Sequence, residues 1–297
     1  MSVNVLRVAA VLYLGAAAAY ILFFARPRHV RAAVAGYWLV VAAFVVHAIS
    51  IGVACAEFGG AEFFNLRGGF GMLGWLAAAA FLVLQRFWRL PSVGAFVLPL
   101  VLVAVMPGVF AGDPAARGPV PEIIRLKTMP VHIFAGTGGV ALFALAFAAA
   151  LMYLLQEREV KGKHFGALFS RLPSLGALDR VTHVLVRLGF AVYTVAFISG
   201  SIVAKKAWGT SWDWDAQQVA ALVIWLLYGL MVVLHRVGVH GRRYAVLTLV
   251  GFALVLTSML GVRNAPGMTK HKGTYQARPP AAAFPVQSPT VPARVVP

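Results

Sequence analysis

Residues 208–215 read WGTSWDWD, and the run AQQVAALVIWLLYGLMVVLH follows directly at 216–235. Three tryptophans and two aspartates therefore lie within eight residues, between two long apolar stretches. Tryptophan side chains favour the headgroup level of a bilayer, so an interfacial anchor is one interpretation of this segment. The other is a platform for a flat, apolar ligand at the membrane–water boundary.

The composition indicates a membrane protein. The chain has 297 residues, of which 61% are hydrophobic and only 12% are charged. A membrane-spanning helix needs about 20 apolar residues, so each long apolar run is a candidate span. We expect an all-α integral membrane protein, a polytopic bundle of about eight transmembrane helices with the Trp-rich segment on its outer face. The expected spans are 5–25, 32–54, 69–85, 92–111, 132–155, 184–204, 218–235 and 244–262.

The chain divides into a membrane domain at 1–264 and a tail at 265–297. Seven of the 16 prolines fall in the tail, with Ala, Val and Ser between them. Such a segment cannot bury a hydrophobic core, so we expect it to be disordered.

Basic residues predict the orientation in the membrane. The first apolar run is followed by Arg26, Arg28 and Arg31, which is the reverse of a signal peptide, so we expect a retained helix with its N-terminus outside. The connections that then face the cytoplasm hold 13 Lys and Arg residues, and the opposite segments hold 7 when the tail is set aside. Cytoplasmic loops carry the excess of positive charge. We therefore expect a multi-pass protein of a bacterial inner membrane with both termini outside the cytoplasm.

Several classes of function are excluded by what the sequence lacks. The net charge of +17 is spread over short loops, without the long basic stripe that nucleic acid requires. Cys55 is the only cysteine, so disulfides, Cys-based zinc sites and covalent haem attachment at C-x-x-C-H are excluded. There is no H-x-x-x-H or H-E-x-x-H metal motif. Carboxylates are absent from the expected spans, which argues against a proton- or sodium-coupled transporter.

Histidines supply the candidate ligands. His132 opens the fifth expected span, and Gly136 and Gly139 follow on its helical face. They predict either a flat slot beneath the imidazole or close packing of two helices. His47 and His235 lie within or at the ends of spans, where an ionisable group is a functional candidate. Their depths differ by about 15 Å in straight helices, so one iron could join them only with helix tilt.

Asp215 and Gln218 form the pattern of a capping box at the start of the seventh expected span. We expect the Asp215 carboxylate to accept from first-turn amides while Gln218 reaches back. This cap would hold Trp212 and Trp214 just outside the span.

The Trp-rich segment followed by Leu234-His235 resembles the signature of the cytochrome c assembly family, which includes the CcsA (ResC) and CcmC proteins. The similarity extends to LPSLGALDRVTHVLVRLGFAVYTVAFISGSIVAKKAWG at 172–209 and MPVHIFAGTGG at 129–139. It also covers GRRYAVLTLVGFALVLTSMLGV at 241–262 and VVHAISIG at 45–52.

The resemblance implies a haem-binding protein that presents haem at the outer face for attachment to apocytochrome c, together with a CcsB (ResB)-like membrane partner. The chain would then be the haem-handling subunit of a cytochrome c synthase, and not an enzyme alone. The implied iron ligands are His132 and His271, although a histidine in a tail would by itself indicate only surface. The implied haem-contacting residues are His235, His47, Trp208, Trp212, Trp214 and Asp215.

Two other functions stay open at this point. HemX- and YpjD-like relatives are as short as this chain, and HemX-like proteins are membrane regulators of haem biosynthesis. A small-molecule transporter with an aromatic gate is the third hypothesis. The chain also departs from the family pattern, because it reads WDAQQ at 214–218 where many CcsA members read WDPKE.

Overall fold

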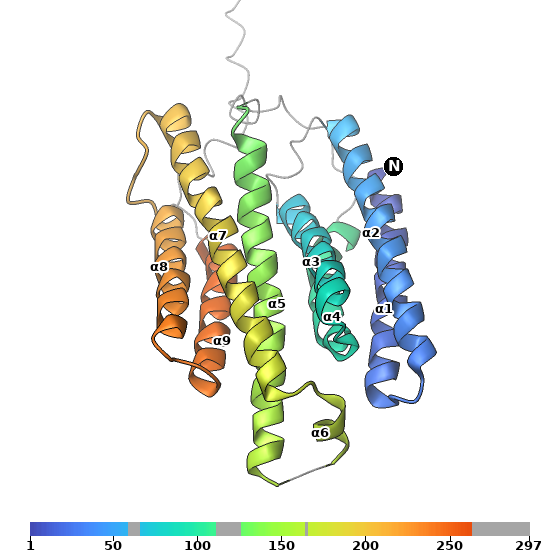
Figure 1. Ribbon diagram of the computed structural model, residues 1–297. Coiled ribbons are helices and arrows are strands. Elements are labelled where there is room, and N and C mark those ends of the chain that lie inside the picture. Colours follow the sequence, from blue (N-terminus) through green and yellow to red (C-terminus); the bar gives the residue numbers. More distant parts are fainter. Residues whose placement is uncertain (59–65, 111–125, 164–165, 263–297) are drawn as a thin grey trace, which may run out of the picture.

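The computed structural model describes residues 1–58, 66–110, 126–163 and 166–262, which fold into helices and their connections (Figure 1). The predicted tail and His271 lie outside these residues. The elements, in chain order, are α1 (Ser2–Ala25), α2 (Val30–Phe58), α3 (Leu66–Trp88), the 3-10 turn Pro91–Val93, α4 (Gly94–Phe110), α5 (Met129–Lys161), α6 (Ala167–Arg171), α7 (Leu175–Trp208), α8 (Ala216–Arg236), α9 (Arg242–Thr257) and a π-helical turn at Ser258–Val262.

Eight helical segments of the described chain are long and apolar enough to cross a membrane, and each corresponds to one predicted span. The prediction of an all-α polytopic membrane protein is confirmed. Helices suit this environment because they pair their backbone N–H and C=O groups internally, where lipid offers no hydrogen-bond partner.

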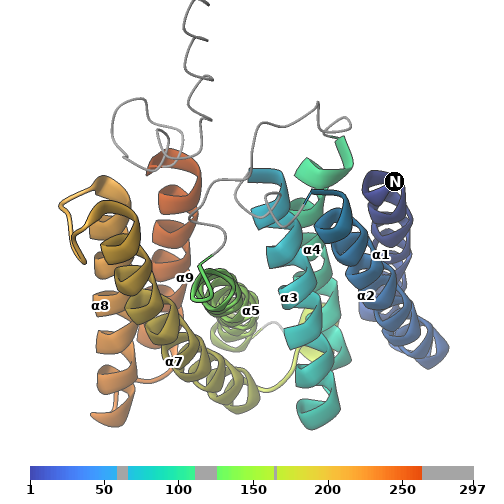
Figure 2. The same cartoon turned by 90° about the horizontal axis from the view of Figure 1, so that it is seen from above.

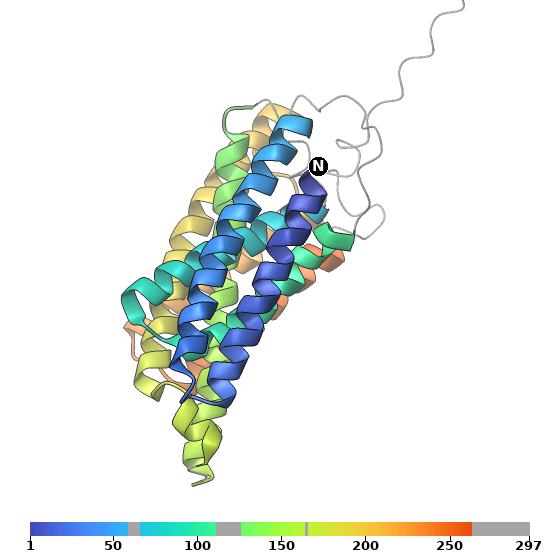
Figure 3. The same cartoon turned by 90° about the vertical axis from the view of Figure 1, so that its right-hand side faces the viewer.

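The helices α5 and α7 are longer than predicted, with 33 and 34 residues. At 1.5 Å per residue each is about 50 Å long, well beyond the ~30 Å hydrocarbon core. The lower ends of α5 and α6 project past the neighbouring helices (Figures 1 and 3). In this projecting part Glu157 pairs with Lys161 at 2.8 Å, one turn away. Hydropathy marks only the membrane-embedded part of a helix, so the predicted loop at 156–183 was too long.

The helix α5 lies at the centre of the bundle (Figure 2). On one side stand α7, α8 and α9, and on the other stand the pairs α1–α2 and α3–α4. The most extensive contact of the fold joins α5 to α7. This contact matters for function because the Trp-rich segment directly continues α7.

Glycines let α5 and α7 approach closely. A Cβ atom placed on Gly139 would lie 2.9 Å from the Cβ and 3.1 Å from the Cα of Tyr193 on α7. A Cβ on Gly189 would lie 2.6 Å from the Phe143 ring on α5. The ligand slot considered for Gly136 and Gly139 is therefore wrong at Gly139, where the backbone of α7 occupies the space. Close helix packing, the alternative, is what Gly139 provides.

We expect Gly139→Ala to destabilise the protein, whereas Gly136→Ala should be tolerated. The added methyl group at 139 meets backbone atoms of Tyr193 that cannot rotate away, and overpacking of this kind costs about 1–3 kcal/mol. At Gly136 the nearest atom is the Cβ of Ala196 at 3.6 Å, an ordinary contact. Thermal unfolding in detergent measures the difference, and equal melting temperatures for the two variants would contradict the packing argument.

Candidate functional site

The Trp-rich segment connects α7 to α8 at the end of the bundle where α5 begins (Figure 1). The helix α7 ends at Trp208 because Gly209 takes a left-handed conformation with φ of 81°. Its N–H donates to the Lys205 carbonyl at 3.0 Å, which closes the last turn. Glycine adopts this conformation without the steric cost of a side chain.

The cap of α8 fixes the other end of the connection. The Asp215 Oδ1 accepts from the Gln217 amide at 2.8 Å, which confirms the predicted N-cap. The Gln218 side chain reaches back as expected, but its Oε1 accepts from the Asp213 amide at 2.7 Å. In a capping box this bond would come from the amide of the N-cap residue, Asp215. Here Gln218 instead binds the amide of Asp213, two residues before the N-cap. The segment between Trp212 and Asp215 is thus held to the first turn of α8.

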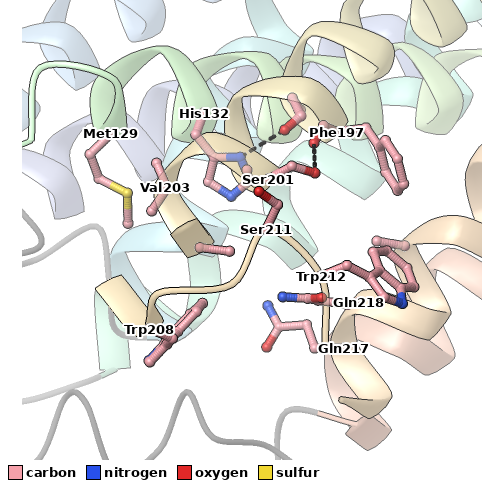
Figure 4. Close-up of a pocket in the computed structure, with 14 residues that line it drawn as sticks. Met129, His132, Phe197, Ser201, Val203, Trp208, Ser211, Trp212, Gln217 and Gln218 are labelled. Carbon is pink, nitrogen blue, oxygen red and sulfur yellow. Dashed lines mark hydrogen bonds between the residues drawn. The ribbon is translucent and has the colours of Figure 1, made fainter. Parts of the chain in front are cut away.

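A cavity of about 150 Å³ lies under this connection (Figure 4). Its walls come from the first turn of α5, the last turns of α7, the connection and the start of α8. The lining residues are Met129, His132, Ala196, Phe197, Gly200, Ser201, Val203, Ala204, Trp208, Ser211, Trp212, Gln217, Gln218 and Ala221.

The imidazole of His132 has a fixed orientation in the cavity. Its Nδ1 lies 2.9 Å from the carbonyl oxygen of Ala196. A carbonyl oxygen only accepts, so the neutral ring must carry its proton on Nδ1 and its lone pair on Nε2. Figure 4 shows the second ring nitrogen pointing into the cavity, and not toward the helix. The side chain therefore offers a ligand nitrogen to whatever occupies the cavity.

Gly200 creates the space for this imidazole. A Cβ atom at this position would lie 2.7 Å from Cε1 and 3.0 Å from Nδ1 of His132. Ala196, which supplies the carbonyl, precedes Gly200 by one helical turn. One face of α7 thus both receives the ring and orients it.

Aromatic rings continue from the membrane span to the surface. Trp225 on α8 stacks on Phe197 with centroids 5.6 Å apart and donates its indole N–H to Thr194 at 3.0 Å. Phe197 contacts Trp212 at 6.3 Å, and Trp212 meets Trp214 edge-on at 5.7 Å. Trp214 is 77% exposed. The row offers apolar ring faces at the boundary of the bundle, and its outermost member is open to a ligand or a partner.

The structure brings together three of the residues that the sequence nominated, namely His132, Trp208 and Trp212. Trp214 and Asp215 are adjacent to the cavity but do not line it. The cavity also contains residues that the sequence analysis missed, among them Phe197, Gly200 and Ser211. A four-residue spacing of Ala196, Gly200, Ala204 and Trp208 was the available signal, since it places these residues on one helical face.

His47 and His235 lie away from the cavity and from each other. His47 is buried, with its ring 5.9 Å from that of Tyr13 on α1. The His235 ring instead stacks on His183 of α7 at 3.4 Å. Their helices, α2 and α8, stand on opposite sides of the bundle, with α5 between them (Figures 1 and 2). Helix tilt does not bring the two imidazoles to one iron.

The comparison with known families matches residues 63–268 to the family described as cytochrome C assembly protein. The chain belongs to this family. The match includes the whole of the cavity and the Trp-rich connection.

Among curated proteins, the chain is similar to the cytochrome c biogenesis protein CcsA of Parasynechococcus marenigrum. The two are 27% identical over 232 residues, which cover 70% of this chain and 75% of the relative. The CcsA protein of Prochlorococcus marinus is 27% identical over 237 residues, covering 70% and 74%. A shorter stretch of 88 residues is 41% identical to the CcsA protein of Synechococcus elongatus, covering 29% and 26%.

We expect Gly200→Ala to release His132 from the Ala196 carbonyl, because the new methyl group would occupy the position of the ring. Nitrogen-15 NMR of histidine-labelled protein, with the His132 signal assigned by its loss in His132→Gln, reports which ring nitrogen carries the proton. The wild type should show a single form protonated on Nδ1, and the variant a mixture of the two. Gly136→Ala, on the same contact between α5 and α7, is the control, and an unchanged spectrum in Gly200→Ala would contradict the proposed positioning.

Proposed function

We propose that the cavity between α5, α7 and α8 binds haem, with His132 as an iron ligand, and that this chain delivers haem for cytochrome c maturation. The observation that carries the proposal is the His132 imidazole, whose Nδ1 is held by the Ala196 carbonyl while Nε2 is directed into the cavity. Histidines that bind metals commonly donate their other ring N–H to a carbonyl in this way. The role in cytochrome c biogenesis follows from the family, and the relatives named CcsA support it.

The size and walls of the cavity fit one edge of a porphyrin. Pockets that enclose a drug-sized ligand measure about 300–1,000 Å³, so a cavity of about 150 Å³ is too small to surround haem. Trp208 and Trp212 offer ring faces to the inserted part, and the exposed Trp214 extends the surface outward. Lys205 and Lys206, exposed in the last turn of α7, are suited to neutralise propionate groups. A ligand held by an edge can be transferred without opening the bundle.

His271 is the proposed second ligand, on the strength of the family resemblance. It lies outside the described residues, but the last described turn, Ser258–Val262, continues α9 and packs against α8, the helix that follows the Trp-rich connection. Nine residues can span roughly 30 Å when extended, so His271 can reach the cavity. Two neutral imidazoles would then complete the coordination of the iron.

The haem is cargo, and its vinyl groups form thioether bonds with cysteines of apocytochrome c, which lie on another protein. We therefore propose a haem-handling role in complex with a CcsB (ResB)-like membrane partner, and not an enzyme alone. The exposed Trp214 and the row of rings behind it support delivery at the surface. The same features, with the CcsA names of the relatives, favour this role over a HemX-like regulator or a transporter.

The proposed location is a bacterial inner membrane, with the cavity and both termini outside the cytoplasm. A phosphatase reporter, which is active only outside the cytoplasm, should be active when fused after Pro297 and inactive when inserted after Lys163, between α5 and α7. The physical reason is the excess of Lys and Arg on the connections at the α5–α6 end. The reverse pattern of activity would place the Trp-rich connection in the cytoplasm and exclude delivery of haem to an outer apocytochrome.

We expect His132→Gly and His271→Gly to reach wild-type levels in the membrane but to retain less haem. Wild-type protein from haem-replete cells should show the absorption spectrum of bis-histidine haem, and each variant should lose most of it and regain part with added imidazole. His29→Gly, an exposed histidine at the other end of the bundle, is the matched control. Wild-type haem content in both variants would show that these residues are not ligands.

Asp215→Ala should lower haem content through a different route, since it removes the bond to the Gln217 amide and a cap worth about 1 kcal/mol. The Trp-rich connection then keeps only the bond from the Asp213 amide to Gln218, while both ligands remain. Added imidazole should therefore fail to restore haem, and restoration would show that Asp215 acts at the iron.

A further inference from the structure

The side of α7 that points away from α5 is not covered by another described helix (Figures 1 and 2). Its exposed side chains recur at alternating spacings of three and four residues, which places them on one face of the helix. The apolar members of this face are Leu188, Ala191, Val195, Ile198 and Ile202. They form a continuous apolar stripe about 21 Å long, a surface suited to contact with lipid chains.

Cations lie at both ends of this apolar stripe. Lys205 and Lys206 follow it on the side of the haem cavity, and Arg180 and Arg187 precede it at the opposite end. All four side chains are exposed. The two arginines are seven residues apart, so they stand on the same face of α7, two turns from each other. They therefore share one edge of the lipid-facing surface.

The stacking of His183 on His235 shows where the two arginines lie relative to the membrane. The ring centroids of the histidines are 3.4 Å apart, so the histidines lie at one level. The helix α8 has 21 residues and is about 30 Å long, which matches the hydrocarbon core, and His235 lies in its last turn. The level of His183 thus marks the membrane boundary. Arg187 lies one turn inside this boundary, and Arg180 lies just under one turn outside it.

The position of Arg187 requires a counter-ion. It is exposed on a lipid-facing surface one turn within the hydrocarbon level, where an unpaired charge is costly. No ion pair or hydrogen bond joins the guanidinium of Arg180 or Arg187 to another part of the described chain. The carboxylate of Asp179 instead accepts from the Gly241 amide at 2.9 Å. A long arginine side chain can return its guanidinium to the headgroup level, where lipid phosphates supply negative charge.

The neighbouring connections add to the positive charge at this end of the bundle. The four segments that connect the spans here hold 13 Lys and Arg residues and only three carboxylates. Glu157, one of the three, is already paired with Lys161 at 2.8 Å. An excess of cations near a membrane surface attracts anionic headgroups. The charge of the whole end therefore favours the same kind of ligand as the two arginines.

We propose that Arg180 and Arg187 form a binding site for the phosphate group of an anionic phospholipid, whose acyl chains lie along the apolar stripe of α7. A guanidinium group donates two parallel hydrogen bonds to a phosphate. A zwitterionic lipid has the same phosphate but adds a cation, which the arginines repel. The proposal goes beyond haem delivery and does not depend on it, and it leaves His235 to the haem contact that the family resemblance implies.

The test uses full-length protein in detergent, and native mass spectrometry counts the lipids that stay bound as phosphatidylglycerol or phosphatidylcholine is added. We expect the wild type to retain one phosphatidylglycerol in preference to phosphatidylcholine. Arg180→Gln and Arg187→Gln should each weaken this binding about fivefold, and together about 30-fold, since one cation near the membrane surface contributes about 1 kcal/mol. Arg243→Gln removes an exposed cation at the start of α9 and is the matched control.

Arg187→Lys keeps the charge and should weaken binding less than Arg187→Gln, which separates loss of charge from damage to the helix. Equal affinity of the wild type for the two lipids would overturn the proposal, as would unchanged affinity for phosphatidylglycerol in the double variant. Inorganic phosphate should not displace the lipid, because it lacks the acyl chains, and displacement at equal concentration would overturn the assignment to a lipid. The double variant should also keep wild-type haem. Loss of haem with unchanged lipid binding would assign the arginines to haem and overturn the lipid site.

Discussion

The close approach of α5 and α7 is the constraint on which the rest of the structure depends. In lipid there is no hydrophobic force that drives one helix against another, so association relies on van der Waals packing between complementary surfaces. Gly139 and Gly189 supply that complementarity, because each leaves room for a neighbour that a Cβ atom would displace. Gly200, further along α7, likewise leaves room for the imidazole of His132. The contact that assembles the bundle is therefore also the contact that orients the candidate ligand.

The residues that stabilise the bundle lie in its interior, whereas the aromatic surface beside the cavity lies at its boundary. The rings of Phe143 and Tyr228 stack 3.5 Å apart in the buried interior, while Trp214 at the end of the aromatic row is largely exposed. A small cavity next to an open aromatic surface suits a cargo that must be released to another protein, since full enclosure would require part of the bundle to open. The π-helical turn that ends α9 and the Gly209 turn that ends α7 lie at this same boundary, where backbone groups need no longer follow the regular helix.

Long helices give one chain two chemically distinct ends. Because α7 extends beyond the hydrocarbon core, it carries the His132 contact near one end and the carboxylate of Asp179 near the other. The ends differ in their neighbours as well. Aromatic rings and uncharged polar groups surround the cavity, whereas imidazoles and one carboxylate gather at the far end.

The amino-acid sequence determined the membrane class, the eight spans, the cap at Asp215 and the nomination of His132 with its tryptophans. These features are local, because hydropathy, helix capping and a short motif each depend on neighbouring residues. The true lengths of α5 and α7 were missed, since polar residues extend a helix beyond the part that hydropathy detects.

Only the tertiary structure decided that Gly139 packs a helix, that Ala196 orients His132, and that His47 and His235 stand apart. It also brought Asp179, His235 and His240 together, from two helices and a connection. These contacts join different helices, so they depend on how each helix is rotated and on the glycine turns at 238 and 241. No periodicity within a single segment contains that information, because it arises only when separate helices pack.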